Sequence, residues 1–574
     1  MNMRPEFNFC RTLILMTIGI ATTAIHADTQ QVDLLLTNAK IYTVNPKQPW
    51  ANTVAIKRGV ISYVGRFENF EDEAVLTLDL KGKMILPGFQ DIHVHPVHSG
   101  VSYQQCVLFD LKGLDNILQA IADCAKEHPE WEWIRGGGWE VPTFAPSGVP
   151  DKVHLDKIVP SRPIALKSSD GHSMWVNSLA LELAGIDSNS SDPKGGRIDR
   201  YQGTSEPSGG LQEDSAMELI HAVEPALTQD EMVSGLRYAQ SHLNSLGITA
   251  VQDAIVKLDG KDAYRGFPAY HQLNDTGELN MHVVAAMYWE NERPIDPQVS
   301  RFVKARELHN RGNIKANSIK IWQDGVIETQ TAALLAPYLD SKNGFRGSLL
   351  NNQSRLNEAV RKLDKAGFQV HFHAIGDAAI RSGLDAVEHA RDTNGIRDAR
   401  HHISHIELFH PDDIPRFKEL DVIANFQPLW AIKDSYVTDL TIPRIGIERA
   451  KYLYPIGSLL RSGARVAFGS DWYVTSANPL LGIEAAITRL EPHGETDQPL
   501  GNNEEITLAE AIEAYTIQSA YVNFLDKVTG SIEMGKQADL IVLDKNLFEI
   551  PASEISDTRV VATIFQGRLV IGEL

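Results

Sequence analysis

The sequence Leu86-Pro-Gly-Phe-Gln-Asp-Ile-His-Val-His95 begins the part of the chain that decides the fold. It continues an apolar run that starts at Met84, and Pro87 and Gly88 break that run where a new domain would begin. Alternate residues of a β-strand point to the same face, so the imidazoles of His93 and His95 project together. Two imidazoles on a rigid backbone form half of a site for a divalent metal ion. We therefore expect a metal site at the end of this strand.

Histidines and one aspartate end three further predicted strands, which read Gln369-Val-His-Phe-His373, His402-Ile-Ser-His405 and Ala464-Arg-Val-Ala-Phe-Gly-Ser-Asp471. Helix-like segments such as 355–366 and 378–389 alternate with strand-like ones, which is typical of a parallel sheet. The strand-like segments are 163–167, 249–253, 283–287, 318–323, 369–373, 402–407, 422–426 and 466–470. Polar residues at the carboxyl ends of such strands are typical of a barrel enzyme. The sequence therefore predicts an α/β protein with a distorted (β/α)8 TIM barrel.

Both ends of the chain have β-strand character instead. Short apolar strands are predicted over 32–44 and 54–64, and again over 540–543 and 560–565. We expect residues 28–86 and 528–574 to form one small β-sandwich domain, and residues 87–527 to form the barrel. The glycine- and tryptophan-rich run Gly136-Gly-Gly-Trp139 predicts an insertion in the barrel at about 130–245.

The first 27 residues have the layout of a secretory signal peptide. Arg4 and Arg11 precede an uncharged, largely apolar run over 12–25, and the small residue Ala27 follows this run. The run is shorter than the roughly 20 residues of a membrane span. We expect cleavage near Ala27 and an exported, periplasmic protein without a membrane anchor. In an oxidising compartment Cys106 and Cys124 could form a disulfide, and two buried thiols are the alternative.

The composition limits the function classes. The chain has 54 Lys and Arg against 74 Asp and Glu, a net charge of −20, so we expect neither nucleic acid nor an anionic membrane as a partner. The sequence contains no GxSxG elbow, P-loop or Rossmann fingerprint. Imidazole and carboxylate ligands suit zinc and its first-row neighbours. Such an ion lowers the pKa of a bound water towards about 7, and a nearby Asp can accept the proton.

Taken together, the motifs resemble the amidohydrolase superfamily, and within it the YtcJ-like, formamide deformylase-like branch (the amidohydrolase 3 family). The resemblance covers about residues 33–571. Besides Leu86–His95, it rests on Ser169-Asp-Gly-His-Ser-Met-Trp-Val-Asn177, Ile319-Lys-Ile-Trp-Gln-Asp-Gly325, His371-Phe-His-Ala-Ile-Gly-Asp377, His401-His-Ile-Ser-His405, Gly469-Ser-Asp-Trp472 and Gly530-Ser-Ile-Glu-Met-Gly-Lys-Gln-Ala-Asp539.

The resemblance implies one or two divalent metal ions, with zinc as the first candidate. The ligands that it implies are His93, His95, His373, His405 and Asp471, and Asp471 would also be the general acid and base. Lys320 matches a strand lysine that CO₂ carboxylates in members with two metals. The residues alone leave an ion pair between Lys320 and Asp324 as the alternative, and His371 as a substitute ligand.

The implied activity is hydrolysis of a non-peptide C–N bond of a small amide or formamide-type substrate by a metal-activated hydroxide. A deaminase, a lactonase or an isomerase would use the same centre, and a non-catalytic binding protein would have lost a ligand. We expect substrate contacts from Trp139, His172, Asp324 and His371, with stabilisation of a loop as the alternative for the first two. Ser404 departs from a glutamate that is common in the family. A homodimer is one possible assembly.

Overall fold

The structure is a computed structural model that describes residues 31–145, 147–341, 343–494, 498–501 and 503–574. The expected signal peptide lies outside these residues. Within the described ranges, no helix combines the length and the apolar character that crossing a bilayer requires.

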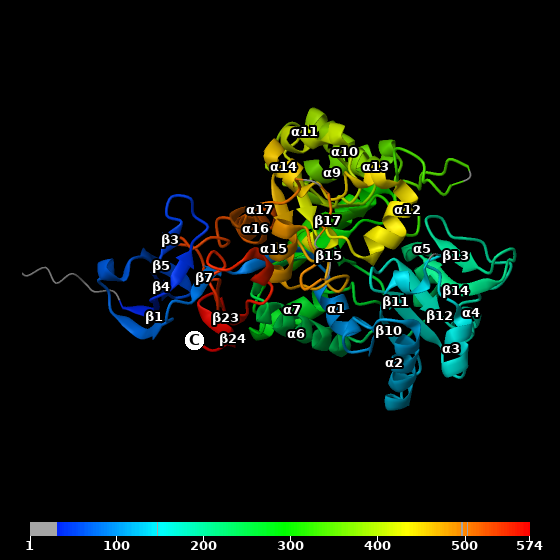
Figure 1. Ribbon diagram of the computed structural model, residues 1–574, viewed down its shortest axis with the longest axis horizontal. Coiled ribbons are helices and arrows are strands. Elements are labelled where there is room, and N and C mark those ends of the chain that lie inside the picture. The colour runs from blue at the N-terminus through cyan, green and yellow to red at the C-terminus, as the bar shows by residue number, and fades with distance from the viewer. Residues whose placement is uncertain (1–30, 146, 342, 495–497, 502) are drawn as a thin grey trace, which may run out of the picture.

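Eight parallel strands form a barrel at the centre of the molecule (Figure 1). In chain order they are β8 (Phe89–Val94), β15 (Ile248–Val256), β16 (His282–Tyr288), β17 (Ile314–Trp322), β18 (Gln369–Ala374), β19 (His402–His405), β20 (Ile423–Phe426) and β21 (Val466–Phe468). Each pairs with the next, and the register shifts within β15 make the barrel irregular. The first and last strands meet at their carboxyl ends, where the backbone N–H of Asp471 donates to the carbonyl of His93 at 2.7 Å. The predicted distorted (β/α)8 barrel is confirmed.

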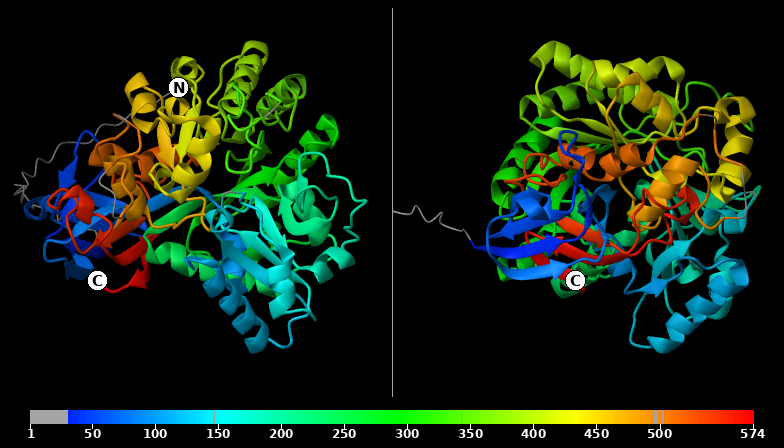
Figure 2. Two further views of the ribbon diagram at one scale, coloured as in Figure 1. Left: turned by 45° about the vertical axis from the view of Figure 1, so that its right-hand side comes forward. Right: turned by 60° about the vertical axis from the view of Figure 1, so that its left-hand side comes forward.

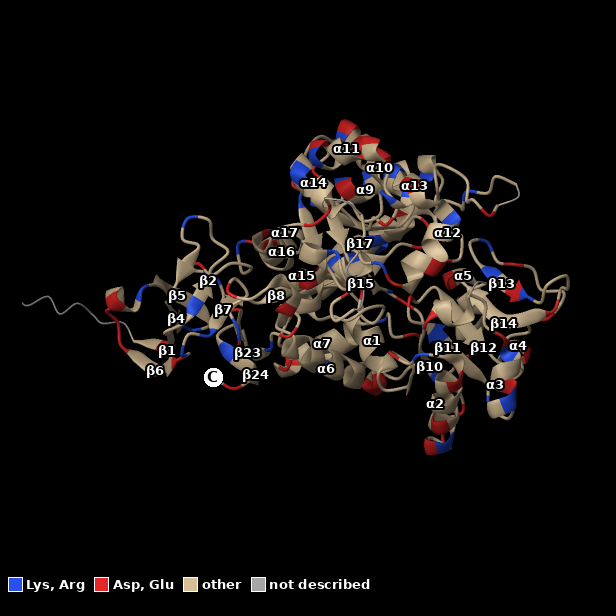
Figure 3. Ribbon diagram, in the orientation of Figure 1, with Lys and Arg blue, Asp and Glu red and all other residues tan. Residues whose placement is uncertain are grey.

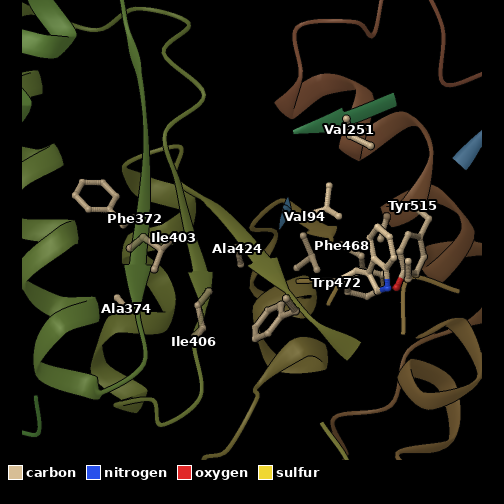
Figure 4. Close-up of a cluster of buried hydrophobic side chains, with 14 of the residues drawn as sticks. Val94, Val251, Phe372, Ala374, Ile403, Ile406, Ala424, Phe468, Trp472 and Tyr515 are labelled. Carbon is tan, nitrogen blue, oxygen red and sulfur yellow. The ribbon is translucent and has the colours of Figure 1, made fainter. Parts of the chain in front are cut away.

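A helix follows each strand and covers the outside of the barrel (Figure 2). The main ones are α6 (Gln229–Ser245), α7 (Phe267–Thr276), α8 (Ile295–His309), α9 (Gln353–Lys365), α10 (Asp377–Asn394), α11 (Ile414–Glu419), α14 (Ile456–Ser462) and α16 (Leu508–Tyr515). Side-chain alternation explains the two faces of each strand. Phe372 packs in the core among the strands and helices (Figure 4), whereas its neighbours His371 and His373 contact residues of other strands within the barrel. The charged residues, blue and red in Figure 3, are found mostly along the outer helices and the loops.

Two sheets at one end of the molecule combine strands from both ends of the chain (Figure 1). One sheet has the order β5 (Val60–Gly65), β4 (Thr53–Lys57), β1 (Val32–Thr37), β6 (Ala74–Asp79); the other has the order β24 (Arg568–Gly572), β23 (Val560–Phe565), β22 (Leu540–Leu543), β7 (Met84–Pro87), β2 (Lys40–Tyr42), β3 (Trp50–Ala51). Leu36 and Ile56 of the first sheet share a buried core with Ile85 and Val542 of the second. This packing of apolar faces holds the two termini in one β-sandwich.

A six-stranded sheet is inserted between β8 and β15. Its order is β13 (Arg197–Arg200), β14 (Pro207–Gln212), β12 (Ser173–Val176), β11 (Ile164–Ser168), β10 (Ile134–Trp139), β9 (Cys106–Val107). The insertion thus begins before residue 130, where the sequence analysis placed its start. The prediction was late because β9 has only two residues and leaves no recognisable sequence pattern. The strand-like segment 163–167 belongs to this sheet and not to the barrel. Residues 229–245, expected in the insertion, form α6, which packs into the barrel core through Leu236 and Leu243.

A disulfide joins Cys106 of β9 to Cys124 of α2 (Leu114–Glu127), with the two Cα atoms 5.8 Å apart. Of the two alternatives for this cysteine pair, the structure has the disulfide. It fastens the first helix of the insertion to the edge of its sheet.

Candidate metal centre

Three side chains meet where the first and last barrel strands end. His93 and His95 project from the end of β8, and Asp471 lies just beyond β21. Oδ1 of Asp471 is 3.0 Å from Nε2 of His95 and 3.6 Å from Nε2 of His93. All three side chains are buried. The backbone of Asp471 has a φ of 57°, a conformation that few non-glycine residues adopt and that is frequent at functional sites.

His405 completes a compact group with these residues. Nitrogen and oxygen atoms of His93, His405 and Asp471 lie within 4.8 Å of one another, which is the spacing that a single bound cation needs. The ring of His405 is centred 4.6 Å from that of His373, which comes from the neighbouring strand β18. The structure thus brings the five predicted ligand side chains of β8, β18, β19 and the segment after β21 to one end of the barrel.

The electrostatics of these side chains fit a divalent cation. Burial lowers the pKa of His93, His373 and His405 well below the ordinary value, so the imidazoles are neutral and can offer lone pairs. Nδ1 of His373 is buried and makes no hydrogen bond among the described residues, and Oδ1 of Asp324 lies 3.5 Å from it. A buried polar nitrogen without a partner is costly in a folded protein, and coordination would satisfy it. We conclude that the donor set fits zinc or a similar ion.

Lys320 lies within this group, on β17. Its Nζ is 3.2 Å from Nε2 of His93. Burial lowers the pKa of Lys320 to about 7, with the charge of Asp471 opposing the shift. Lys320 and Asp324, both of which the structure describes, do not form the alternative ion pair. The carboxylate of Asp324 instead accepts backbone N–H groups at 2.9 to 3.0 Å, from Ala333, Ile375 and Gly376.

His371 stands behind His93 and holds its ring. Nε2 of His371 is 3.1 Å from Nδ1 of His93, and Nδ1 of His371 is 2.7 Å from Oε1 of Gln252. The amide of Gln252 donates its own N–H groups to Gln369 and Asn523, so its oxygen must face His371. His371 then donates to Gln252, and its Nε2 is an acceptor that faces both Nδ1 of His93 and the hydroxyl group of Ser404, which is 2.8 Å away. Nε2 of His93 faces Lys320 and Asp471. Both nitrogens of His371 are occupied in this way, so it supports a ligand and does not face a substrate.

A glutamine side chain also orients His405. Its Nδ1 is 2.8 Å from Oε1 of Gln427, and the amide of Gln427 donates to Asn425 at 3.3 Å. The indole of Trp430 stacks on the His405 ring at 5.0 Å. Nδ1 of His405 therefore carries the proton, and Nε2 is available to a cation.

The inserted sheet contributes His172 to the neighbourhood of the site. The ring of His172 is centred 5.4 Å from that of His373, and its Nδ1 is 2.8 Å from a carboxylate oxygen of Glu213. Burial opposes protonation of His172, but Glu213 outweighs it and raises the pKa to about 9. Trp139 lies elsewhere: it is in the hydrophobic core of the insertion, and its indole N–H donates to the carbonyl of Leu166 at 2.8 Å. The alternative reading of Trp139 as a stabilising residue therefore fits the structure, because its one polar group is already bonded.

Sequence reasoning missed Asp91, Gln252 and Gln427, which hold the predicted ligands in place, and Glu213, which holds His172. Asp91 accepts the backbone N–H groups of both His93 and Ser470 at 3.0 Å. Gln252 had a usable signal, because it is a polar residue in the otherwise mostly apolar strand 248–256. For Gln427, the signal was its place directly after β20.

Known proteins share this architecture. An uncharacterized metal-dependent hydrolase from Pyrococcus horikoshii superposes on this chain with a TM-score of 0.70 at 25% sequence identity. The superposition covers 90% of this chain and 99% of the Pyrococcus chain. The YtcJ protein of Bacillus subtilis is 29% identical over 536 residues, 92% of this chain and 98% of its own. N-substituted formamide deformylase of Arthrobacter pascens is 27% identical over 556 residues, 94% of this chain and 98% of its own.

The family profile agrees with the predicted resemblance. The profile described as the amidohydrolase family matches residues 76–571. This range includes the whole barrel and all the predicted metal ligands, from His93 to Asp471. With its metal-dependent structural neighbour, this match supports a hydrolase. The chain is a member of the amidohydrolase family.

Proposed function

We propose that the protein is a metal-dependent hydrolase that cleaves a non-peptide C–N bond in an amide or formamide-type substrate. The observation that carries this proposal is the buried carboxylate of Asp471, 3.0 Å from Nε2 of His95 and within the same group of neutral imidazoles. The name of the related N-substituted formamide deformylase adds support for the bond type.

In this proposal the ligand side chains His93, His95, His373, His405 and Asp471 hold the ion, and their neutral or anionic forms favour a cation. A bound divalent ion supplies Lewis acidity and a more acidic water. Asp471 accepts a proton from the attacking water. The water oxygen becomes bonded to the carbonyl carbon, the C–N bond breaks, and Asp471 returns the proton to the departing nitrogen. The products are a carboxylic acid and an amine.

We also propose that CO₂ carboxylates Lys320. An ordinary lysine is protonated at neutral pH, but with a pKa of about 7 a large fraction of Lys320 is a free amine. Nζ bonds to the carbon of CO₂ and loses one proton, which yields an anionic carbamate. That anion would place a negative charge next to His93 and so favour a second metal ion at the site.

The test is a hydrolysis screen on zinc-loaded protein, with products identified by mass. N-formyl and N-acyl amines, amino-acid amides and lactones form the panel. Release of a carboxylic acid together with an amine, or with ammonia in the case of the amino-acid amides, supports the proposal. Ammonia without a new carboxylic acid would indicate a deaminase, and a hydroxy acid from a lactone would indicate a lactonase. The Asp471→Asn variant should retain zinc and lose at least about a hundredfold in kcat. Full turnover by zinc-loaded Asp471→Asn protein would refute the proposed role of Asp471.

For localisation, we propose export to the periplasm with cleavage near Ala27. The disulfide between Cys106 and Cys124 supports an oxidising compartment. Fractionation of cells, with sequencing of the mature N-terminus, tests this: a protein that begins at its first Met and is recovered in the cytosol would contradict it.

A further inference from the structure

A large cavity lies between the inserted sheet and the barrel, next to the metal centre. Its volume is about 1100 Å³, slightly above the roughly 300–1,000 Å³ of small-molecule sites. Trp322 at the end of β17 lines the cavity, and its ring is centred 5.8 Å from that of His373. Glu213, which holds His172, lines it as well. The predicted ligands do not line the cavity themselves, but Trp322 and Glu213 connect its wall to His373 and His172.

One buried cation faces this cavity from the insertion. Lys167 lies on β11, where Ile164 and Leu166 pack into the core of the insertion while Ala165 and Lys167 line the cavity. Only 9% of the surface of Lys167 is exposed. Its Nζ lies 5.3 Å from the centre of the Tyr264 ring, and it forms no ion pair with a described residue. A buried ammonium group without a carboxylate partner is expensive to maintain.

The other charges that line the cavity include paired and unpaired groups, and the carboxylates of Asp214 and Glu218 form no ion pair among the described residues. Nζ of Lys257 is 3.0 Å from a carboxylate oxygen of Asp262, so that cation is already paired. Asp214 is the first residue of α5 (Asp214–His221), where the helix N-terminus favours a negative charge. Burial lowers the pKa of Lys167, and the nearby charge of Asp214 opposes this shift without forming an ion pair. Lys167 is thus a buried cation of the cavity wall that forms no ion pair with a described residue.

Tyr264 lies next to both Lys167 and the predicted metal ligand His95. Its ring is 5.3 Å from Nζ of Lys167 on one side, and 5.8 Å, centre to centre, from the ring of His95. His98, which lines the cavity, stacks on the same ring at 4.4 Å. Tyr264 thus contacts both Lys167 and His95 and links this cation to the predicted metal ligands.

We propose that Lys167 binds a carboxylate group of the substrate, so that the enzyme acts on N-acyl or N-formyl amines that carry an acidic group. This inference rests on the proposed amide hydrolysis. A charge-assisted hydrogen bond from a desolvated ammonium group to a carboxylate is strong and directional. It would pair the buried charge and orient the scissile bond towards Asp471.

The experiment compares two substrates that differ only in this group, N-formylphenylalanine and N-formylphenethylamine, on zinc-loaded protein. For Lys167→Met we expect kcat/KM for the acidic substrate to fall about 10- to 100-fold, and kcat/KM for the neutral one to change less than about twofold. Lys167→Arg should recover part of the loss. Lys261→Met, which removes an exposed lysine of the same cavity, is the matched control and should leave both values unchanged. An equal loss for both substrates would overturn the proposal.

A binding measurement separates this proposal from the proposed reaction. Calorimetric titration of 3-phenylpropionate into zinc-loaded wild-type protein should show binding that Lys167→Met weakens at least tenfold and Lys261→Met does not. This result would support the carboxylate site even if neither formamide were hydrolysed, in which case the proposed reaction alone would fail. Equal affinity of the wild-type and Lys167→Met proteins would overturn the carboxylate site. Lys167→Gln repeats the test should the methionine variant not fold.

Discussion

The carboxylate of Asp91 accepts both the backbone N–H of Ser470, at 3.0 Å, and the hydroxyl group of Ser470. The two residues belong to opposite ends of the barrel sequence, Asp91 on the first strand and Ser470 just after the last. Each is also close in sequence to a proposed ligand, His93 or Asp471. The closure of the barrel and the geometry of the metal centre therefore depend on the same side chain.

Replacing Asp91 should weaken both. Asp91→Ala would leave three buried donors without an acceptor, the backbone N–H groups of His93 and Ser470 and the Ser470 hydroxyl. We expect the free energy of unfolding to fall by about 3 kcal/mol, measured by urea denaturation of metal-free protein. Asp91→Asn keeps one acceptor oxygen and should lose less. Unchanged stability of Asp91→Ala would contradict the closing role of this residue.

The hydrogen-bond chain behind His93 predicts a loss of metal affinity. Gln252→Leu removes the acceptor that fixes the tautomer of His371, and through it that of His93. We expect the affinity for zinc to fall by about 10- to 100-fold, measured by competition with a chromogenic chelator. Gln252→Glu keeps an acceptor oxygen and should bind zinc more tightly than Gln252→Leu. Equal zinc affinity in wild type and Gln252→Leu would show that the chain does not position His93.

The low pKa of Lys320 predicts a pH dependence of carboxylation. CO₂ reacts with the free amine, and the free fraction of a group with a pKa of about 7 rises as the pH increases through 7. A ¹³C NMR carbamate signal from metal-free protein under ¹³CO₂ should therefore be weak at pH 6 and strong at pH 8. Lys320→Arg should give no such signal. A signal of equal strength at both pH values, or one that persists in Lys320→Arg, would assign the carbamate to another amine.

The ion pair of His172 and Glu213 predicts an imidazolium at neutral pH. With a pKa raised to about 9, His172 should remain protonated from pH 6.5 to 8 in an NMR titration of labelled histidine. The stability that this pair contributes is complete below pH 6.5 and is lost as the pH rises through 9. Glu213→Gln removes the charge that outweighs burial, so the His172 pKa should then fall below 6.5. A His172 resonance that titrates near pH 6.5 in the wild type would disprove the pairing.

The disulfide predicts a stability difference confined to the insertion. Joining Cys106 to Cys124 closes a loop over a sequence separation of 18 residues, which is worth about 3 kcal/mol through the entropy of the unfolded chain. The Cys106→Ser/Cys124→Ser variant should therefore show faster amide hydrogen exchange in α2 and β9, with exchange in the barrel strands unchanged. Identical exchange in α2 of the two proteins would mean that packing alone holds this helix.

The residues that sequence could predict are those whose identity and spacing carry the chemistry. His93 and His95 share a strand face, and Asp471 comes at the end of an apolar strand. Once a parallel barrel was expected, the sequence could therefore predict that these three side chains lie close together. Gln252 and Asp91 act through partners on other strands, and such contacts have no local signature. The start of the insertion was missed for a related reason: β9 has two residues and exists as a strand only because β10 pairs with it.

The order of the ligands along the chain has a consequence for biosynthesis. A ribosome completes His93 and His95 while most of the barrel is still to be made, and Asp471 emerges only after the eighth barrel strand. A nascent chain of 450 residues would thus hold the two histidines without the carboxylate or the closing strand. Incorporation of metal into the complete centre must follow the synthesis of nearly the whole polypeptide, and a product of premature termination before residue 471 cannot be rescued by added zinc.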